Sequence, residues 1–494
     1  MDINFNNSID IVLINVPSVA TSSPLLAPAL LKSSVLTAGF TAKTIDFNIK
    51  FNTKYTKEVD QYFTTTQATD QIKKLTESII IDWVDEVLIY NPKWVGISIF
   101  TYQCRVAAEI FAKLLKSKRS DVKIVLGGSG IGDGGINGKN SYSEQLQRQG
   151  LIDHFIMSEA EISLVKLLQN DLKYPGIDSN TFNQIKNIDA LPFPDFDDYI
   201  FSQYSFNKRL PIYGSRGCVR RCSFCDIHQH WKYTFRTGQS IAEEMIAQSK
   251  KYKINEFHFM DSLVNGSLKE FRKFLKYMAE YNVNVDADKK ITWIGYYIVR
   301  DPQAEGKEYW ELMEQSGAKQ LIVGIESGSE KVRYEMNKKF KNSDVDYLVK
   351  KLVQHNISCT FLMIFGYVTE TEKDYEDSLN FIRKYKNLAG KTIFSIHISD
   401  TLSILPGTPL FNDLEKLGIV LDPKHENNWI STNNPTLTLS ERIRRVSEAK
   451  KLVKELGYIE EIGVHDLLSY LVDNVKIFDT RIDVIKKIIE IKKI

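Results

Sequence analysis

The chain has 494 residues, of which 43% are hydrophobic and 26% charged, an ordinary balance for a globular protein. This length predicts two or three domains, and a formal net charge of +2 excludes the strongly basic surface typical of nucleic-acid or acidic-membrane binding. No apolar run reaches the roughly 20 residues of a membrane span, and residues 1–5 do not begin a secretory signal. With only five cysteines, these features predict a cytoplasmic protein.

Residues 1–185 are predicted to form a domain in which strands and helices alternate. Short apolar runs such as residues 10–16 are typical of strands buried on both faces of a sheet. The alternation predicts a parallel, doubly wound α/β sheet with ligands at the carboxyl ends of its strands. The expected strands cover residues 10–16, 41–47, 94–100, 122–126 and 154–157, and the expected helices cover 27–39, 70–90, 105–116 and 161–170.

Residues 186–209 are predicted to be a linker, because they contain Pro192, Pro194 and several acidic side chains. Strand–helix units resume over residues 210–415 and predict a partial TIM-type (β/α)6 barrel with its chemistry on the loops at the strand carboxyl ends. Residues 416–494 are predicted to be mostly helical. The six expected barrel strands cover residues 210–215, 256–261, 291–298, 320–326, 359–366 and 392–399.

Three of the five cysteines, Cys218, Cys222 and Cys225, follow the first expected barrel strand with the spacing C-x3-C-x2-C. Iron–sulfur clusters are held by cysteine thiolates, and three local ligands would leave one iron of a four-iron cluster open to a substrate or cofactor. A zinc site completed by His228 or His230 is one alternative, and three cysteines buried only for packing are another. Their position inside a repeating strand–helix domain favours the cluster, because small zinc modules usually stand alone.

With Phe224 as the aromatic residue before the third cysteine, this motif resembles that of the radical SAM superfamily. Residues 324–329 (Gly-Ile-Glu-Ser-Gly-Ser) and 406–409 (Pro-Gly-Thr-Pro) are similar to the subgroup with an N-terminal cobalamin-binding domain, and residues 189–195 resemble the junction before its barrel. The resemblance covers residues 10–415. It implies a Rossmann-like, cobalamin-binding-like domain, then a radical SAM barrel and a C-terminal helical segment.

By this resemblance, the three cysteines hold a 4Fe–4S cluster whose open iron binds S-adenosylmethionine (SAM). An electron passed through the cluster would cleave SAM and form a 5′-deoxyadenosyl radical. Phe224 is expected to pack near the adenine, and Asp261 and Ser262 to lie near the methionine moiety. Glu326 is expected to contact SAM, and Gly324 to let the backbone come close. The alternatives are that Asp261 serves only a turn and that Glu326 is only an ion-pair partner at the barrel mouth.

The loop after the fifth expected barrel strand departs from the subgroup. Residues 365–371 read Phe-Gly-Tyr-Val-Thr-Glu-Thr where the subgroup has Gly-Leu-Pro-Gly-Glu-Thr, so the proline and the second glycine are missing. This departure predicts a loop of another shape, and the usual adenine contact is not carried over to it.

The first domain carries half of a cobalamin-binding signature. Ser98 and Phe100, followed by Gly127 and Gly128, are similar to its S-x-L…G-G part, in which the serine faces the nucleotide tail and the glycines let that tail approach the backbone. The D-x-H-x-x-G half is absent and no histidine precedes His154, which excludes an axial imidazole from the usual early loop. Members of the subgroup often lack that histidine, so cobalamin is expected here; the alternative is a domain that kept the fold and lost the cofactor.

The resemblance therefore implies a cobalamin-dependent radical SAM enzyme, a methyltransferase acting on an unactivated carbon or on phosphorus. Its substrate would be a small molecule or a peptide, and its reductant a flavodoxin or ferredoxin. A radical SAM enzyme without cobalamin, performing hydrogen abstraction, rearrangement or oxidation, is the second reading, and a non-catalytic metal-stabilised binding protein is the third. A methylthiotransferase is disfavoured, because its second cluster needs N-terminal cysteines and Cys104 is the only one in that region.

Overall fold

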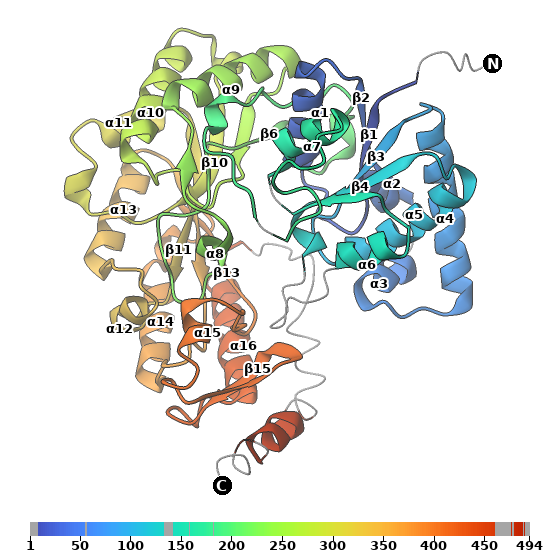
Figure 1. Ribbon diagram of the computed structural model, residues 1–494. Coiled ribbons are helices and arrows are strands. Elements are labelled where there is room, and N and C mark those ends of the chain that lie inside the picture. Colours follow the sequence, from blue (N-terminus) through green and yellow to red (C-terminus); the bar gives the residue numbers. More distant parts are fainter. Residues whose placement is uncertain are drawn as a thin grey trace. The chain divides into compact units, whose positions relative to one another are not determined.

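The computed structural model describes residues 8–54, 57–132, 142–157, 159–180, 182–459, 476, 479–487 and 489. The chain divides into two compact units, Met1–Pro211 and Ile212–Ile494 (Figure 1). None of the helices in the described ranges is long and apolar enough to cross a membrane.

The first unit is built on a parallel five-stranded sheet with the order β2-β1-β3-β4-β5. In this order the chain reverses direction across the sheet between β1 and β3, which is the switch point where doubly wound folds bind ligands. The elements, in chain order, are β1 (Ile11–Asn15), α1 (Leu26–Thr37), β2 (Ala42–Asp46), α2 (Phe47–Lys54), α3 (Lys57–Thr65), α4 (Asp70–Leu88), β3 (Trp94–Ser98), α5 (Cys104–Lys118), β4 (Lys123–Gly127), α6 (Tyr142–Arg148), β5 (His154–Ile156) and α7 (Ala160–Leu168).

Helices cover both faces of this sheet, as the unbroken apolar strands predict. Because side chains alternate along a strand, Val12 and Ile14 enter the core shared with α4 and α5, whereas Ile11 and Leu13 pack with α1 and α7. Figure 1 shows α4 and α5 on one side of the sheet and α1 and α7 on the other. The five strands expected from the sequence are all present, and α2 and α3 form in the segment after the second strand, where no helix was expected.

The predicted linker is held against the first unit by ion pairs. Asp195 lies 2.8 Å from the Lys32 ammonium, and Asp198 lies 2.7 Å from both Lys32 and Lys43. Lys32 is buried, so its charge depends on these two carboxylates. The end of the segment is attached as well, since the Tyr204 hydroxyl donates to Asp46 at 2.6 Å.

The second unit is built on a six-stranded sheet with the order β13-β12-β11-β10-β9-β6, in which β9 to β13 pair in parallel. β6 and β13 are the two edges, so the sheet is an open, partial barrel with the six strands that the sequence predicts. The elements up to the last barrel strand are β6 (Arg209–Ile212), β7 (Ser215–Arg216), α8 (Ile227–His230), β8 (Thr234–Phe235), α9 (Gly238–Tyr252), β9 (Glu256–Phe259), α10 (Leu268–Val283), β10 (Thr292–Tyr297), α11 (Tyr309–Gln315), β11 (Ala318–Glu326), α12 (Glu330–Glu335), α13 (Asn342–Gln354), β12 (Ser358–Met363), α14 (Glu372–Lys384) and β13 (Ile393–Ile398).

Aromatic side chains join the outer face of this sheet to its helices. Trp293 of β10 packs edge-on against Phe271 and Phe274 of α10, and Phe361 of β12 contacts Phe381 of α14. These contacts place the alternate residues of each strand on the inner face of the barrel. Figure 1 shows α10, α11 and α13 along the outside of the curved sheet.

The C-terminal segment contains a hairpin in addition to the expected helix. After α15 (Pro409–Asn412), strands β14 (Ile419–Asp422) and β15 (His425–Ser431) pair antiparallel and precede α16 (Leu439–Glu455). The N-cap of α16 is Thr438, whose hydroxyl accepts from the Glu441 amide. Most of the predicted helical segment after residue 459 lies outside the described residues.

Candidate functional site

The cysteine-bearing loop leaves the carboxyl end of β6 and is framed by a short antiparallel pair of strands, β7 and β8. Gly217 precedes the first cysteine with a φ of +76°. A side chain there would come within 3.0 Å of the Lys232 carbonyl. Glycine is therefore required where the chain enters the cysteine motif.

Ser223, one of the two residues between the second and third cysteines, is fixed through all of its polar groups. Its amide donates to the Met336 carbonyl at 3.1 Å, and its own carbonyl accepts from the Leu410 amide at 2.8 Å. Its hydroxyl lies 2.8 Å from the Tyr367 hydroxyl. Three separate segments thus hold the centre of the motif in one position.

The three thiols lie close enough to influence one another, and burial raises the pKa of each. Cys222 is buried, whereas Cys218 and Cys225 are half-buried, so the loop presents thiols to a partly water-shielded space. Lys338 opposes the effect of burial on all three. A nearby cation of this kind favours the thiolate form, which is the form that binds metals.

Among the described residues, no three His, Cys, Asp or Glu side chains converge closely enough to hold one metal ion. A four-iron cluster takes each thiolate on a different iron, so its ligands need not converge in that way. Three thiols on one rigid loop beside a lysine are a donor set that fits such a cluster. Of the two histidines considered as zinc ligands, the side chain of His230 lies outside the described residues.

Glu326 ends β11 and forms a buried ion pair. Its carboxylate lies 2.8 Å from the Lys338 ammonium, and both side chains are about one-tenth exposed. A side chain at Gly324 would come within 2.3 Å of this carboxylate and 2.8 Å of the ammonium. Glu326 is thus an ion-pair partner, its expected contact with SAM stays a prediction, and Gly324 leaves the space that the pair occupies.

Asp261 follows β9 and binds the segment that leads into the cysteine loop. Its buried carboxylate accepts from the Gly214 amide at 2.8 Å and from the Ser215 hydroxyl at 2.6 Å. Burial raises the pKa of Asp261 to about 7. The adjacent Ser262 is half-buried. Asp261 therefore positions the start of the loop, and its expected place near the methionine moiety stays a prediction.

Phe224 is partly buried and packs against an apolar cluster that includes Val332, Ile364 and Tyr367. The ring therefore links the cysteine loop to the loop after β12. This contact is compatible with a ring that also forms one wall of an adenine pocket.

In the first unit, the predicted cobalamin residues Ser98 and Gly127 lie in one row across the carboxyl edge of the sheet. Register pairs Asp46 with Asn15, Asn15 with Ser98, and Ser98 with Gly127. Ser98 and Asn15 end the two strands that flank the switch point. Within the described part of the chain, the Asn15 side-chain oxygen is buried without a hydrogen-bond partner. A side chain at Gly127 would meet only the Ile156 carbonyl among the described residues, at 3.8 Å.

The backbone conformation and packing at residue 128 require glycine. Its φ is +109° and ψ is 167°, a region that only glycine readily adopts. A side chain there would lie 2.5 Å from the Ile99 carbonyl oxygen. Phe100 is 51% exposed just beyond this contact. His154, the only histidine of the first unit, begins β5 at the opposite edge and pairs with Asp178 at 2.6 Å.

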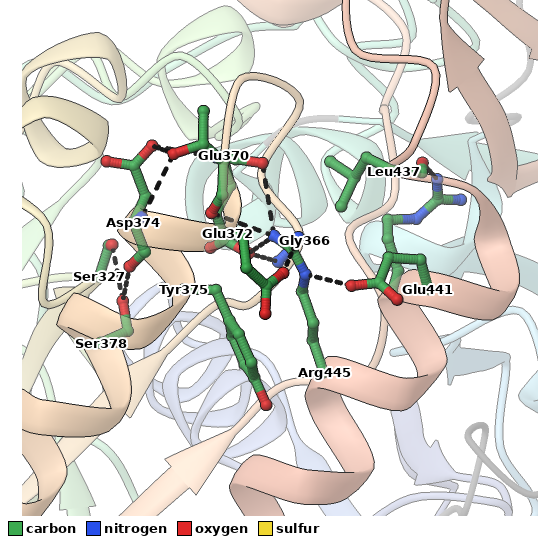
Figure 2. Close-up of polar contacts among 12 residues, drawn as sticks. Ser327, Gly366, Glu370, Glu372, Asp374, Tyr375, Ser378, Leu437, Glu441 and Arg445 are labelled. Atoms are coloured by element: carbon green, nitrogen blue, oxygen red, sulfur yellow. Dashed lines mark hydrogen bonds and ion pairs between the residues drawn. The ribbon is translucent and has the colours of Figure 1, made fainter.

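The loop that departs from the subgroup is bound to α16 (Figure 2). Glu370 is fully buried, and its carboxylate accepts from the Gly366 amide and from Arg445, each at 2.9 Å. Arg445 also pairs with Glu372 and Glu441. The loop is therefore held by the C-terminal helix, and the changed shape expected from its sequence stays a prediction.

Three residues of these sites were missed by sequence reasoning. Lys338 and Asn15 carry no motif, and only folding brings them to Glu326 and to the switch point. Tyr367 lies in the departing loop, so the departure itself was the available signal. Its hydroxyl could have been recognised as a polar group in an otherwise apolar stretch.

A sequence model of the Radical SAM superfamily matches residues 212–382. Among curated proteins, the bacteriochlorophyllide d C-12(1)-methyltransferase of Chlorobaculum tepidum is 25% identical over 240 residues, which cover 47% of this chain and 49% of that protein. The anaerobic magnesium-protoporphyrin IX monomethyl ester cyclase of Synechocystis is 24% identical over 276 residues, 51% of this chain and 53% of that protein. The chain thus spans about half the length of these curated relatives.

Among solved structures, the radical S-adenosylmethionine methyltransferase TsrM from Kitasatospora setae, with cobalamin and a 4Fe–4S cluster bound, has a similar fold. The similarity covers 97% of this chain and 99% of that chain, with a TM-score of 0.63 and 14% identity. It confirms the expected α/β fold with a Rossmann-like domain followed by a partial barrel. The superfamily expected from the cysteine motif is confirmed too: residues 212–382 are a domain of the radical SAM superfamily.

Proposed function

We propose that this chain is a cobalamin-dependent radical SAM enzyme that cleaves SAM reductively and transfers a methyl group to an unactivated carbon or to phosphorus. The observation that carries the proposal is the cysteine loop, which places three thiols after the first strand of the superfamily's domain and is fixed by three other segments. The names of the Chlorobaculum and Kitasatospora proteins support methyl transfer. The substrate is a small molecule or a peptide, and the reductant is a flavodoxin or ferredoxin.

The residues of the second unit have distinct roles in this proposal. Cys218, Cys222 and Cys225 hold a 4Fe–4S cluster, which, when bound, supplies an electron to SAM at its open iron. The contacts of Ser223 would keep the three thiols in one arrangement when the cluster is bound. Reduced thiols are needed for assembly, which supports a reducing compartment such as the cytoplasm.

The geometry leads us to assign a specific role to each of the remaining predicted SAM contacts. Phe224 provides an apolar wall for the adenine, and Glu326 acts as a member of the Glu326–Lys338 pair rather than as a free carboxylate. Asp261 orients the start of the cysteine loop, because its carboxylate accepts hydrogen bonds from Gly214 and Ser215. Of Asp261 and Ser262, we assign the half-buried Ser262, which follows β9, to the methionine moiety.

Cobalamin is assigned to the carboxyl edge of the first sheet. Ser98 and Asn15 flank the switch point, and Gly127 ends the neighbouring strand β4. Among the described residues, Gly127 leaves open space and Asn15 has an unpaired acceptor. Exposed Phe100 adds apolar surface beside them. We assign Gly128 to the shape of the loop rather than to direct contact. The boundaries 1–185, 186–209, 210–415 and 416–494 are retained as the proposed domain division.

The products of SAM distinguish the candidate functions. Protein reconstituted with iron, sulfide and hydroxocobalamin is incubated with SAM and a strong reductant, and the products are quantified. Methyl transfer leaves S-adenosylhomocysteine, and reductive cleavage leaves 5′-deoxyadenosine. We expect both products in the presence of substrate, whereas neither product would contradict the proposal.

A second candidate is a radical SAM enzyme without cobalamin. Two observations favour it: the structure explains Gly128 by packing, and His154 is paired with Asp178. One relative is named a cyclase rather than a methyltransferase. In the same assay this candidate gives 5′-deoxyadenosine alone, with no dependence on hydroxocobalamin.

A further inference from the structure

A continuous chain of polar contacts joins the C-terminal helix α16 to the cysteine loop. Arg445 of α16 binds the buried carboxylate of Glu370 at 2.9 Å. The same carboxylate oxygen accepts the Gly366 amide, also at 2.9 Å. The next residue, Tyr367, is 3% exposed and its hydroxyl reaches Ser223 at 2.8 Å.

The loop also packs directly on α16. Gly366 has a φ of +77°, and a side chain there would come within 2.7 Å of Arg442. Arg442 is fully buried, donates to the carbonyls of Trp429 and Leu437, and lies over the Trp429 ring. It is therefore immobile, and the loop has no room to move toward the helix.

From these contacts we infer that α16 is a brace for the cysteine loop: Arg445, acting through Glu370 and Tyr367, is a positioning residue that holds Ser223 between Cys222 and Cys225. This inference rests on the proposed function, because the loop that is braced is the one assigned to the cluster. It gives a role to Tyr367, which stands where the subgroup pattern has leucine, and to Glu370, which the loop shares with that pattern. The loop is shaped by a partner outside the barrel, and the C-terminal segment is a working part of the radical SAM site.

The first test uses the protein without its cluster and so does not depend on the cofactor. Alkylation of Cys222 by iodoacetamide is followed by mass spectrometry in the full chain and in Tyr367→Phe and Arg445→Gln. Cys222 is 8% exposed, so its labelling reports how often the loop opens. We expect labelling about fivefold faster in Tyr367→Phe, the size that the loss of one buried hydrogen bond gives. We expect it to be faster still in Arg445→Gln, which leaves the buried Glu370 carboxylate without its ion-pair partner.

The matched control is Arg444→Gln, on the same helix. Arg444 is 40% exposed and shares Glu372 and Glu441 with Arg445, but its partners among the described residues do not include the buried Glu370. Its loss leaves the Arg445–Glu370 pair in place, so we expect an unchanged labelling rate. The double variant, Tyr367→Phe with Arg445→Gln, is expected to label no faster than the faster single variant, because both act through one path. Circular dichroism establishes that each variant is folded.

Wild-type labelling rates in a folded Tyr367→Phe would overturn the inference, even if Arg445→Gln failed to fold. A labelling rate in the double variant that rises by the product of the two single-variant increases would overturn the inference as well. The second readout is the electron paramagnetic resonance spectrum of the reduced, reconstituted protein, in which SAM is expected to shift the signal less in both variants than in Arg444→Gln. A wild-type protein that forms no cluster would contradict the proposed function alone, since the labelling experiment would still decide the brace.

Discussion

Gly128→Ala tests whether this glycine serves the fold of the first unit. The methyl group would lie 2.5 Å from the Ile99 carbonyl oxygen and 2.9 Å from its carbon. The two backbones would have to move apart by about 0.5 Å to reach 3.0 Å. The backbone conformation alone costs about 1–3 kcal/mol for any other residue, so we expect a total loss of about 2–4 kcal/mol. For a unit of about 200 residues this lowers the melting temperature by about 5–15 °C.

The assay is thermal unfolding of the full chain followed by calorimetry, with Gly127→Ala as the matched control. A methyl group at Gly127 meets only one carbonyl, at 3.8 Å, so we expect unchanged stability within about 0.5 kcal/mol. Gly127→Ala is instead expected to retain less cobalamin after desalting, because it fills the open space at the switch point. A Gly128→Ala protein as stable as the wild type, or a Gly127→Ala protein as unstable as Gly128→Ala, would refute the reasoning.

Three further variants follow from the second unit. The folded-state pKa of Asp261 is about 7 against an ordinary 3.8, so the contribution of this group to stability falls as the pH rises from about 4 to about 7. This contribution is worth up to about 4 kcal/mol. Asp261→Asn should remove it, as measured by urea unfolding at several pH values. Lys338→Met strands a buried carboxylate and should cost about 3 kcal/mol, and adding Glu326→Gln should restore part of it; equal losses in the single and double variants would contradict the ion pair. Arg442→Met leaves three carbonyls without their donor and should lower the melting temperature more than Arg444→Gln does.

Much of the fold could be predicted because its signals are local. The apolar runs such as residues 10–16 and the glycine and proline breaks between them mark the strands of both sheets. The hairpin β14–β15 was not predicted, because residues 419–431 are rich in polar side chains. Its strands are stabilised by tertiary contacts, above all the stacking of Arg442 on Trp429 at 3.7 Å, which no local pattern reveals.

The candidate site could be predicted from the sequence only where its residues lie close together in one segment. Cys218, Cys222 and Cys225 lie within eight residues, so spacing alone indicated their chemistry. The partners that set their position come from segments more than 100 residues away, as Ser223 and Tyr367 illustrate. Glu326 was recognised, but whether it was free or paired depended on Lys338, which the sequence does not distinguish from the other lysines.

The central claim, that the cysteine loop carries an iron–sulfur cluster beside a cobalamin-binding domain, is tested most directly by stoichiometry. The protein is reconstituted without oxygen with iron, sulfide and excess hydroxocobalamin, desalted, and measured for metals, sulfide and cobalamin, with Cys222→Ser in parallel. We predict about four irons and four sulfides per chain, about one cobalamin, and loss of iron and sulfide in Cys222→Ser. Zinc without sulfide in the wild-type protein would contradict the account.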